Sequence, residues 1–383
     1  MLSKAAPSSS PSSDLIRRSI LVPLSTATLC YLTFFLALLI PFFQRHFIFL
    51  HSIAFPLFPT YNQPQCYGLA PHKTRNLQLA TSDGEKIGTW HVLPEIYYQS
   101  ELPAKQDEEK WGDDVYSRAL REYPTILYLH GNSMNRAAPW RISAYQGMTS
   151  RVDANVIAID YRGFGDSSGT PSEPGLVEDA QTAYDFVREQ QGTAKQPVIV
   201  FGQSLGTGIT ALLAAALESR SSPADGIVLM APYTDLKSLV KDFKVGGLLP
   251  VLKPICLIPF NSVILDTFLK THLNTKDTLP QLEKTPVVLL HAKDDPVIPL
   301  YHSHKLFENI RSHRKHKEIL ERRVNDYASI KKLPSNKAAE VTLIETDTGG
   351  HNQLTEGALD LVRLALRLPS HLSVLTQAIE CRV

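Results

Sequence analysis

The chain has 383 residues, of which 43% are hydrophobic and 20% are charged, and its formal net charge is +1. This length and composition predict one large globular domain with attachments, and the near-neutral charge indicates no nucleic-acid partner. The four cysteines lie far apart without a Cys-x-x-Cys pair, a pattern that argues against a zinc cluster and against a dense disulfide scaffold.

The N-terminal part is expected to be a disordered tail followed by a membrane anchor. Residues 1–18 form the tail, which is rich in serine and proline and cannot bury apolar area. No charged residue occurs from Ile20 to Phe43. At about 1.5 Å per residue such a run is long enough to cross a hydrocarbon core of about 30 Å. We therefore predict a transmembrane helix over residues 19–43 and a membrane-proximal segment over residues 44–72.

A removable signal peptide is the alternative interpretation of the apolar run. The run is longer than the apolar core of a typical signal peptide and no small-x-small cleavage site follows it, which favours an uncleaved anchor. Lys4, Arg17 and Arg18 before the run favour a cytosolic N-terminus and a lumenal catalytic domain. Arg45 and Lys73 on the other side weaken that charge bias.

Beyond the anchor, apolar runs of strand type alternate with helix-forming segments, and a polar stretch from Pro94 to Tyr123 is interpreted as a surface excursion. The expected strands cover residues 74–79, 86–93, 125–130, 156–160, 198–201, 226–230, 287–291 and 340–344. The expected helices cover residues 141–151, 173–191, 204–219, 301–310 and 356–368. This alternation predicts an α/β fold with a mostly parallel, eight-stranded sheet and helices on both faces.

A nucleophile elbow is predicted between Val198 and Leu217. A strand-type run is followed by Gly202-Gln203-Ser204-Leu205-Gly206 and then by a run rich in alanine and leucine. In such an elbow a strained turn exposes the serine hydroxyl, and the two glycines let the strand and helix backbones pass closely. The pentapeptide also occurs by chance, so the expectation that Ser204 is a nucleophile depends on its partners.

The acid and the base of a serine triad are expected after later strands, because reactive groups gather at the carboxyl ends of a parallel sheet. Asp295 follows its strand directly and begins the run Asp-Pro-Val-Ile-Pro, which favours Asp295 over Asp294 as the acid. His351 lies in a glycine-rich loop between the last strand and the last helix and is the expected base. The chain order Ser204, Asp295, His351 is the order expected for a serine on an elbow of this kind.

Catalysis by such a triad also requires hydrogen-bond donors for the oxyanion that develops on the substrate. The backbone N–H groups of Leu205, at the start of the elbow helix, and of Asn132, just after the third strand, are the candidates. This chemistry needs no cofactor and no metal ion.

These motifs resemble those of α/β-hydrolases, and within that superfamily those of the membrane-anchored lysophosphatidylserine lipase and monoacylglycerol lipase branch. The stretches that carry the resemblance are 72–76, 88–91, 127–132, 160–173, 204–208 and 290–296. The resemblance spans nearly everything from residue 20 to residue 368, and we expect the catalytic domain to cover residues 73–383. The resemblance implies a lipid acyl-ester substrate and a single-pass protein of the endoplasmic reticulum with a lumenal catalytic domain. Gln203 departs from the branch, in which a histidine precedes the nucleophile.

Two insertions in the catalytic domain are expected to influence specificity. Residues 233–285, after the sixth strand, occupy the position of a lid and contain the apolar stretches 245–250 and 256–260. These stretches are interpreted either as an acyl-binding lid or as the core of an extra helix pair. Residues 311–337 are basic and are interpreted either as a surface for an anionic headgroup or membrane, or as a solvated, flexible insert.

The sequence therefore predicts a membrane-anchored serine hydrolase that cleaves acyl esters of lipids through an acyl-enzyme. The resemblance implies that the substrate is a lysophospholipid or a monoacylglycerol. A protein acyl-thioesterase or an aminopeptidase-like hydrolase is the enzymatic alternative, because one triad serves all of these reactions. A catalytically silent membrane scaffold is the alternative from another class, and a broken triad would be its mark.

Overall fold

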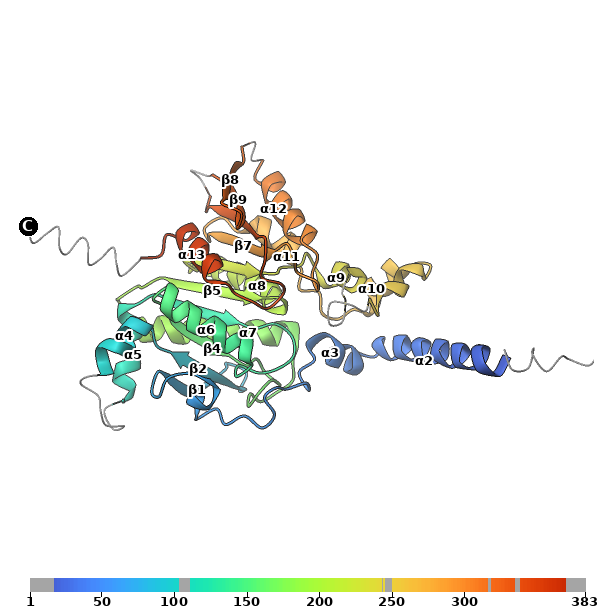
Figure 1. Cartoon of the computed structure of the whole chain (residues 1–383), viewed down its shortest axis with the longest axis horizontal. Helices are drawn as coiled ribbons and strands as arrows, with labels where there is room; N and C mark the ends of the chain where they lie inside the picture. The colour runs from blue at the N-terminus through green and yellow to red at the C-terminus, as the bar shows by residue number, and fades with distance from the viewer. Residues whose placement is uncertain are drawn as a thin grey trace, which may run out of the picture.

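A mixed sheet forms the centre of the computed structural model, which describes residues 17–102, 111–242, 244, 250–315, 318–334 and 338–369 (Figure 1). Its ten strands are ordered β1-β2-β4-β3-β5-β6-β7-β10-β9-β8. The strands are β1 (Thr74–Ala80), β2 (Lys86–Val92), β3 (Thr125–Leu129), β4 (Asn155–Ile159), β5 (Val198–Gln203), β6 (Gly226–Met230), β7 (Val287–Ala292), β8 (Leu320–Val324), β9 (Ala328–Leu333) and β10 (Val341–Thr346).

The middle of the sheet is parallel and both edges are antiparallel. From β4 to β10 the neighbouring strands run parallel, whereas β1, β2, β9 and β8 pair antiparallel. The predicted α/β-hydrolase fold class is confirmed, but the expected count of eight strands is wrong. The two additional strands, β8 and β9, form a hairpin within the basic insertion.

The hairpin escaped prediction because it lies at the sheet edge. Four of the five residues of β8 are exposed, and the strand has the sequence Leu-Glu-Arg-Arg-Val, which lacks the apolar run of a central strand. Charged side chains on an edge strand prevent pairing with other chains, so such strands resemble loops in composition. Residues 316–317 and 335–337 of the basic insertion lie outside the described residues.

Helices cover both faces of the sheet, as predicted. The sheet divides the hydrophobic core into two main clusters, one on each face. The cluster on one face includes Tyr184 of α7 and Phe307 of α12, and the cluster on the other includes Tyr145 of α6 and Leu359 of α13. These and the other helices of the catalytic domain are α4 (Glu95–Glu101), α5 (Asp113–Glu122), α6 (Pro139–Arg151), α7 (Glu173–Gln191), α8 (Leu205–Ser219), α9 (Leu236–Asp242), α10 (Asn261–Phe268), α11 (Thr275–Thr278), α12 (Tyr301–His313) and α13 (Glu356–Ala365).

The polar stretch from Pro94 to Tyr123 is more structured than a surface excursion. Its described part contains α4 and α5, which bury Tyr97, Tyr98, Val115 and Tyr116 in a third cluster. The charged residues that flank these aromatic positions hid the pattern in the sequence. Residues 103–110 lie outside the described part.

The N-terminal apolar run is divided into two helices. A π-helical turn, η1 (Arg17–Leu21), leads into α2 (Val22–Leu38), and α3 (Pro41–Phe49) follows after a break. The break occurs at Ile40, which has an extended backbone because a residue before proline disfavours the helical conformation. The helix from Ser19 to Leu38 is 20 residues long and apolar enough to cross a membrane. The larger part of the predicted tail, residues 1–16, lies outside the described residues.

The predicted lid after β6 is helical, and its helices α9 and α10 lie on the same side of the domain as α2 (Figure 1). It contains α9, η5 (Lys253–Leu257), α10, α11 and η6 (Leu279–Gln281). Of the two apolar stretches noted in the sequence, residues 256–260 are described, whereas residues 245–249 lie outside the described residues.

Candidate active site

Ser204 lies in a strained turn between β5 and α8. Its backbone has φ 51° and ψ −117°, a conformation that non-glycine residues rarely adopt. A Cβ atom on Gly202 would lie 2.4 Å from the carbonyl oxygen of Gly206, and one on Gly206 would lie 2.1 Å from the carbonyl oxygen of Leu129. These approaches allow only glycine at both positions, as a nucleophile elbow requires.

The structure brings together the three residues expected to form a triad. His351 Nε2 lies 3.0 Å from Ser204 Oγ, and His351 Nδ1 lies 2.9 Å from Asp295 Oδ2. Both distances are within hydrogen-bond range. The arrangement can transfer a proton from the serine hydroxyl to the imidazole, with the carboxylate holding the tautomer that leaves Nε2 free to accept.

The carboxylate of Asp295 is fully buried and is held by several donors. Its Oδ1 accepts hydrogen bonds from the backbone N–H groups of Val297 and Ile298, at 2.8 and 3.0 Å. His291 Nε2, at the end of β7, lies 3.4 Å from Oδ2. Burial by itself raises the pKa of this carboxyl group, but the hydrogen bonds from His291 and His351 outweigh burial and hold its pKa well below the ordinary value. Asp295 is therefore ionised at neutral pH.

Asp294 has a different position from Asp295. Its Oδ1 accepts a hydrogen bond of 2.7 Å from the backbone N–H of Gly350, and its Oδ2 lies 3.4 Å from the N–H of Gly349. Asp294 therefore holds the loop that carries His351, whereas Asp295 contacts the imidazole.

Gln203 supports the same loop from the other side. Its side-chain oxygen accepts a hydrogen bond from the hydroxyl group of Tyr128. Its amide nitrogen donates to Asn352 Oδ1 at 3.1 Å and to the carbonyl oxygen of His351 at 3.4 Å. The residue that departs from the resembled branch therefore connects β5 to the loop of His351.

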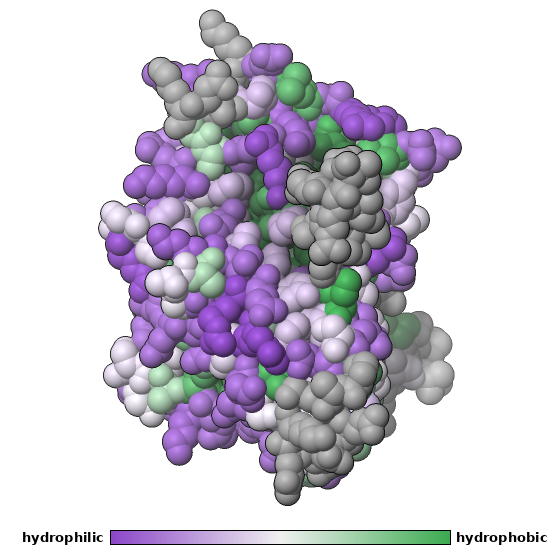
Figure 2. All heavy atoms as spheres, turned by 90° about the vertical axis from the view of Figure 1, so that its left-hand side faces the viewer, coloured by the Kyte–Doolittle hydropathy of each residue, from purple (hydrophilic) through white to green (hydrophobic). Residues whose placement is uncertain are grey.

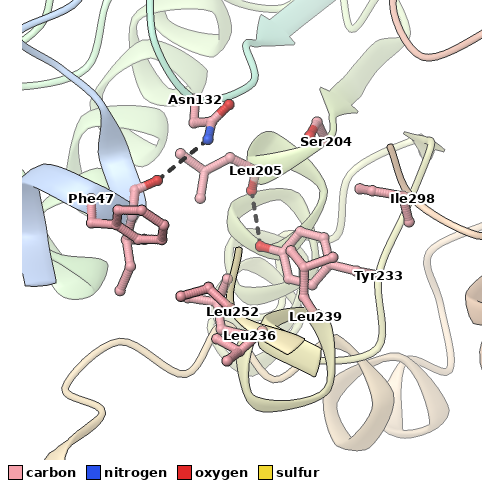
Figure 3. Close-up of a pocket in the computed structure, with 11 residues that line it drawn as sticks. Phe47, Asn132, Ser204, Leu205, Tyr233, Leu236, Leu239, Leu252 and Ile298 are labelled. Carbon is pink, nitrogen blue, oxygen red and sulfur yellow. Dashed lines mark hydrogen bonds between the residues drawn. The ribbon is translucent and has the colours of Figure 1, made fainter. Parts of the chain in front are cut away.

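The two candidate oxyanion donors face the same space as the serine. Asn132, Ser204 and Leu205 line one cavity (Figure 3). Gly131 lets the two backbones approach, because a Cβ atom there would lie 3.2 Å from Ser204 Cβ. Neither the Asn132 N–H nor the Leu205 N–H donates a hydrogen bond to another residue in the described part of the chain. The side-chain amide nitrogen of Asn132 lies 3.5 Å from the carbonyl oxygen of Ile48, in the contact marked by a dashed line in Figure 3.

The cavity beside Ser204 is apolar and has walls from three parts of the chain. Phe47 and Ile48 come from α3, and Ile298 comes from the segment after β7. The lid contributes the remaining lining residues, which are Tyr233, Leu236, Leu239, Val240 and Leu252. The sequence did not predict the role of α3. Most of α3 falls in the predicted membrane-proximal segment, residues 44–72, and that prediction did not place any of its side chains at the site.

The described residues contain no group of three or more histidine, cysteine, aspartate or glutamate side chains that could hold a metal ion. Within the same residues Cys30, Cys66 and Cys256 are free and exposed. Cys381 lies outside the described part of the chain.

The fold and the elbow define a serine hydrolase of the α/β-hydrolase class, and comparison with known proteins agrees. Residues 148–257, which include Ser204, match the family model Hydrolase_4, serine aminopeptidase S33. An α/β-hydrolase from Vibrio vulnificus has a similar structure, with a TM-score of 0.54 at 16% identity over 84% of this chain and 89% of that one. At this identity the likeness shows the fold alone.

The sequence relatives are more specific. The chain is 32% identical to lysophosphatidylserine lipase ABHD12 of Rattus norvegicus over 297 residues, which are 76% of this chain and 71% of the relative. It is also 32% identical to the Xenopus tropicalis protein of the same name over 274 residues, 71% of this chain and 67% of the relative. The chain therefore belongs to the ABHD12 family of α/β-hydrolases, and the resemblance noted in its sequence is confirmed.

Proposed function

We propose that the chain hydrolyses acyl esters of lipids, with Ser204 as the nucleophile, His351 as the general base and acid, and Asp295 as the residue that orients the imidazole. The observation that carries the proposal is the pair of short contacts from His351, 3.0 Å to Ser204 Oγ and 2.9 Å to Asp295 Oδ2. A serine hydroxyl becomes a good nucleophile only when such a base removes its proton.

The reaction proceeds in two halves. In the first, Ser204 Oγ attacks the ester carbonyl while His351 Nε2 takes its proton, and the N–H groups of Leu205 and Asn132 stabilise the oxyanion. The imidazolium then gives the proton to the leaving alcohol, and an acyl-serine remains. In the second half His351 activates a water molecule, which releases the fatty acid and restores the serine.

A lipid substrate is supported by the cavity and by the relatives. The lining residues are almost all apolar and suit a hydrocarbon chain. The relatives are named lysophosphatidylserine lipases. We assign this chain the same class of substrate, a monoacyl lipid such as a lysophospholipid or a monoacylglycerol, and the headgroup is the part to be determined by experiment.

The apolar helix supports attachment to a membrane. We propose that the helix from Ser19 to Leu38 spans the bilayer of the endoplasmic reticulum, with the catalytic domain in the lumen. The basic residues Arg17 and Arg18 at its N-terminal end favour that orientation. Protease protection of the catalytic domain in sealed microsomes tests the orientation, and digestion without detergent would contradict it.

Peptide hydrolysis is the second candidate, because the matched family model describes serine aminopeptidases. An aminopeptidase must bind the charged amino terminus of its substrate, which requires an anionic or strongly polar subsite beside the nucleophile. The described residues that line the cavity of Ser204 include no charged side chain. The cavity therefore favours an acyl chain over a peptide terminus.

A hydrolysis panel tests the proposed function. The full chain in detergent is offered lysophospholipids, monoacylglycerols, acyl-thioesters and aminoacyl amides, with Ser204→Ala as the control. We expect turnover of the monoacyl lipids by the wild type only. Turnover restricted to thioesters or amides would replace the proposed substrate class. Equal turnover by the wild type and by Ser204→Ala would reject the proposal that Ser204 makes the chain a hydrolase.

A further inference from the structure

The lid is fastened to the C-terminal half of α2 and to α3 by polar contacts in an otherwise apolar region. The hydroxyl group of Tyr31, in α2, donates a hydrogen bond of 2.7 Å to the carbonyl oxygen of Val251 in the lid. Gln44, in α3, is 8% exposed. Its amide nitrogen donates to the carbonyl oxygens of Leu38 at 3.1 Å and Phe268 at 3.0 Å.

Gln44 also accepts from the lid, since the backbone N–H of Lys270 lies 2.8 Å from its side-chain oxygen. One buried amide therefore joins the C-terminal end of α2, the start of α3 and the C-terminal end of α10. The position of the lid is thereby fixed relative to the anchor.

A second apolar cavity lies between the anchor and the lid. Its walls come from α2, α3, α9, η5 and α10, and Gln44 is its only polar lining residue among those described. Phe47, Ile48, Val240 and Leu252 line this cavity and also the cavity of Ser204. The two cavities therefore lie next to each other and share a wall of apolar side chains.

The tip of the lid exposes large apolar side chains. Leu257 is 85% exposed, Phe260 82% and Val263 61%. No charged residue occurs from residue 254 to residue 265. The neighbouring positions Ile264, Leu265 and Phe268 line the cavity beside α2, so the tip extends the apolar surface of the anchor. The opposite face of the domain, turned away from α2, is mainly hydrophilic (Figure 2). Clustered apolar exposure of this kind marks an interaction surface.

We propose that this tip, residues 254–263, enters the same lipid surface that the anchor helix enters, and that acyl chains pass from the lipid phase to Ser204 through the cavity between α2, α3 and the lid. The second half of the proposal rests on the proposed function, whereas the first half does not. The occupant is a lipid surface because the tip continues the surface of α2, the element that is apolar enough to span a membrane.

Quenching by brominated lipids tests the surface without any turnover. The variant Phe260→Trp, as full chain in phosphatidylcholine vesicles, is compared with Leu364→Trp, a matched control on α13 whose native leucine is 67% exposed. Each variant adds tryptophan fluorescence to the wild-type signal. Bromine on the lipid acyl chains is expected to reduce the fluorescence added by Phe260→Trp about twofold and to leave the fluorescence added by Leu364→Trp unchanged. Equal emission in brominated and ordinary vesicles would overturn the proposal. If the tryptophan introduced at position 260 is shielded from iodide in the water but is not quenched by bromine, the tip contacts protein and not lipid. That result would overturn the proposal as well.

The route is tested by the ratio of two activities. The double variant Leu257→Ser, Phe260→Ser is expected to lower about tenfold the ratio of long-chain monoacylglycerol hydrolysis in vesicles to hydrolysis of a short-chain soluble ester. The control Leu364→Ser is expected to keep the wild-type ratio. An unchanged ratio in the double variant would overturn the route. Failure of the wild type to hydrolyse either ester would count against the proposed function, and the bromine result would still decide the surface.

Discussion

His351 Nε2 lies 3.0 Å from Ser204 Oγ, although 147 positions separate the two residues in the chain. The contact forms because β5 and β10 end at the same edge of the sheet, so the elbow after one strand meets the loop after the other. Asp294 and Gln203 hold that loop by hydrogen bonds to its backbone and to Asn352. The site therefore depends on the order of the strands as much as on the identity of the reacting residues.

The acid of the triad is expected to be Asp295 and not its neighbour. Asp295→Asn removes the charge that stabilises the imidazolium and favours the wrong tautomer, so turnover is expected to fall about 10⁴-fold. Asp294→Asn keeps an oxygen that can accept from Gly350 and is expected to cost about tenfold or less. Steady-state rates on one monoacyl lipid distinguish the two variants. A larger loss in Asp294→Asn would reverse the assignment.

Low pH is expected to reduce the contribution that Asp295 makes to the stability of the folded state. The folded pKa of Asp295 lies below the unfolded value of about 3.9, so the ionised form stabilises the folded state above that pH, and the effect is lost as the pH falls through the folded pKa. The difference in thermal stability between wild type and Asp295→Asn should therefore be larger at neutral pH than near pH 3. Melting curves in detergent measure it, and a difference that grows on acidification would contradict the ionised assignment.

Gly202 is expected to tolerate no side chain. The added Cβ in Gly202→Ala would meet the backbone oxygen of Gly206 at 2.4 Å, and the expected cost is about 3 kcal/mol or more. Gly147→Ala is the control, because its Cβ would meet a single side-chain atom, Leu359 Cδ1 at 2.8 Å, and no backbone atom. Alanine within α6 should change the free energy of unfolding by about 1 kcal/mol or less. Equal melting temperatures for the two variants would argue against a strained elbow.

Phe47 is expected to bind the acyl chain. Phe47→Ala removes an aromatic wall shared by both cavities, and the lost contact should raise KM for a long-chain monoacyl lipid about tenfold. Phe42→Ala changes an exposed residue of the same helix and should leave KM near the wild-type value. Similar KM values for Phe47→Ala and wild type would place the acyl chain elsewhere.

The parts of the fold and site that could be predicted are those that local sequence encodes. Buried parallel strands such as β5 are continuous apolar runs. The glycines around Ser204 indicate that two backbones approach closely, as a nucleophile elbow requires. Asp295 and His351 were predicted because both follow strands of this kind. Their convergence required only the rule that parallel strands end at one edge.

The remaining features depend on contacts that local sequence does not encode. Strands β8 and β9 are paired through backbone hydrogen bonds at an edge, where charged side chains are favourable, so they carry no apolar signal. The sequence around Phe47 has the composition of a membrane-interface segment. Only the position of α3 in the tertiary structure places Phe47 at the cavity of Ser204. Gln44 is one of three successive polar residues, and nothing in the local sequence indicates its three partners at Leu38, Phe268 and Lys270.

Labelling with a fluorophosphonate probe, read beside hydrolysis of a monoacyl lipid, tests the central claim most directly. The probe reacts only with a serine whose hydroxyl is activated by a base, so the wild type should be labelled and Ser204→Ala should not. Hydrolysis should be lost in the same variant. Equal labelling of wild type and Ser204→Ala, or an unlabelled wild type, would contradict Ser204 as the nucleophile of a lipid hydrolase.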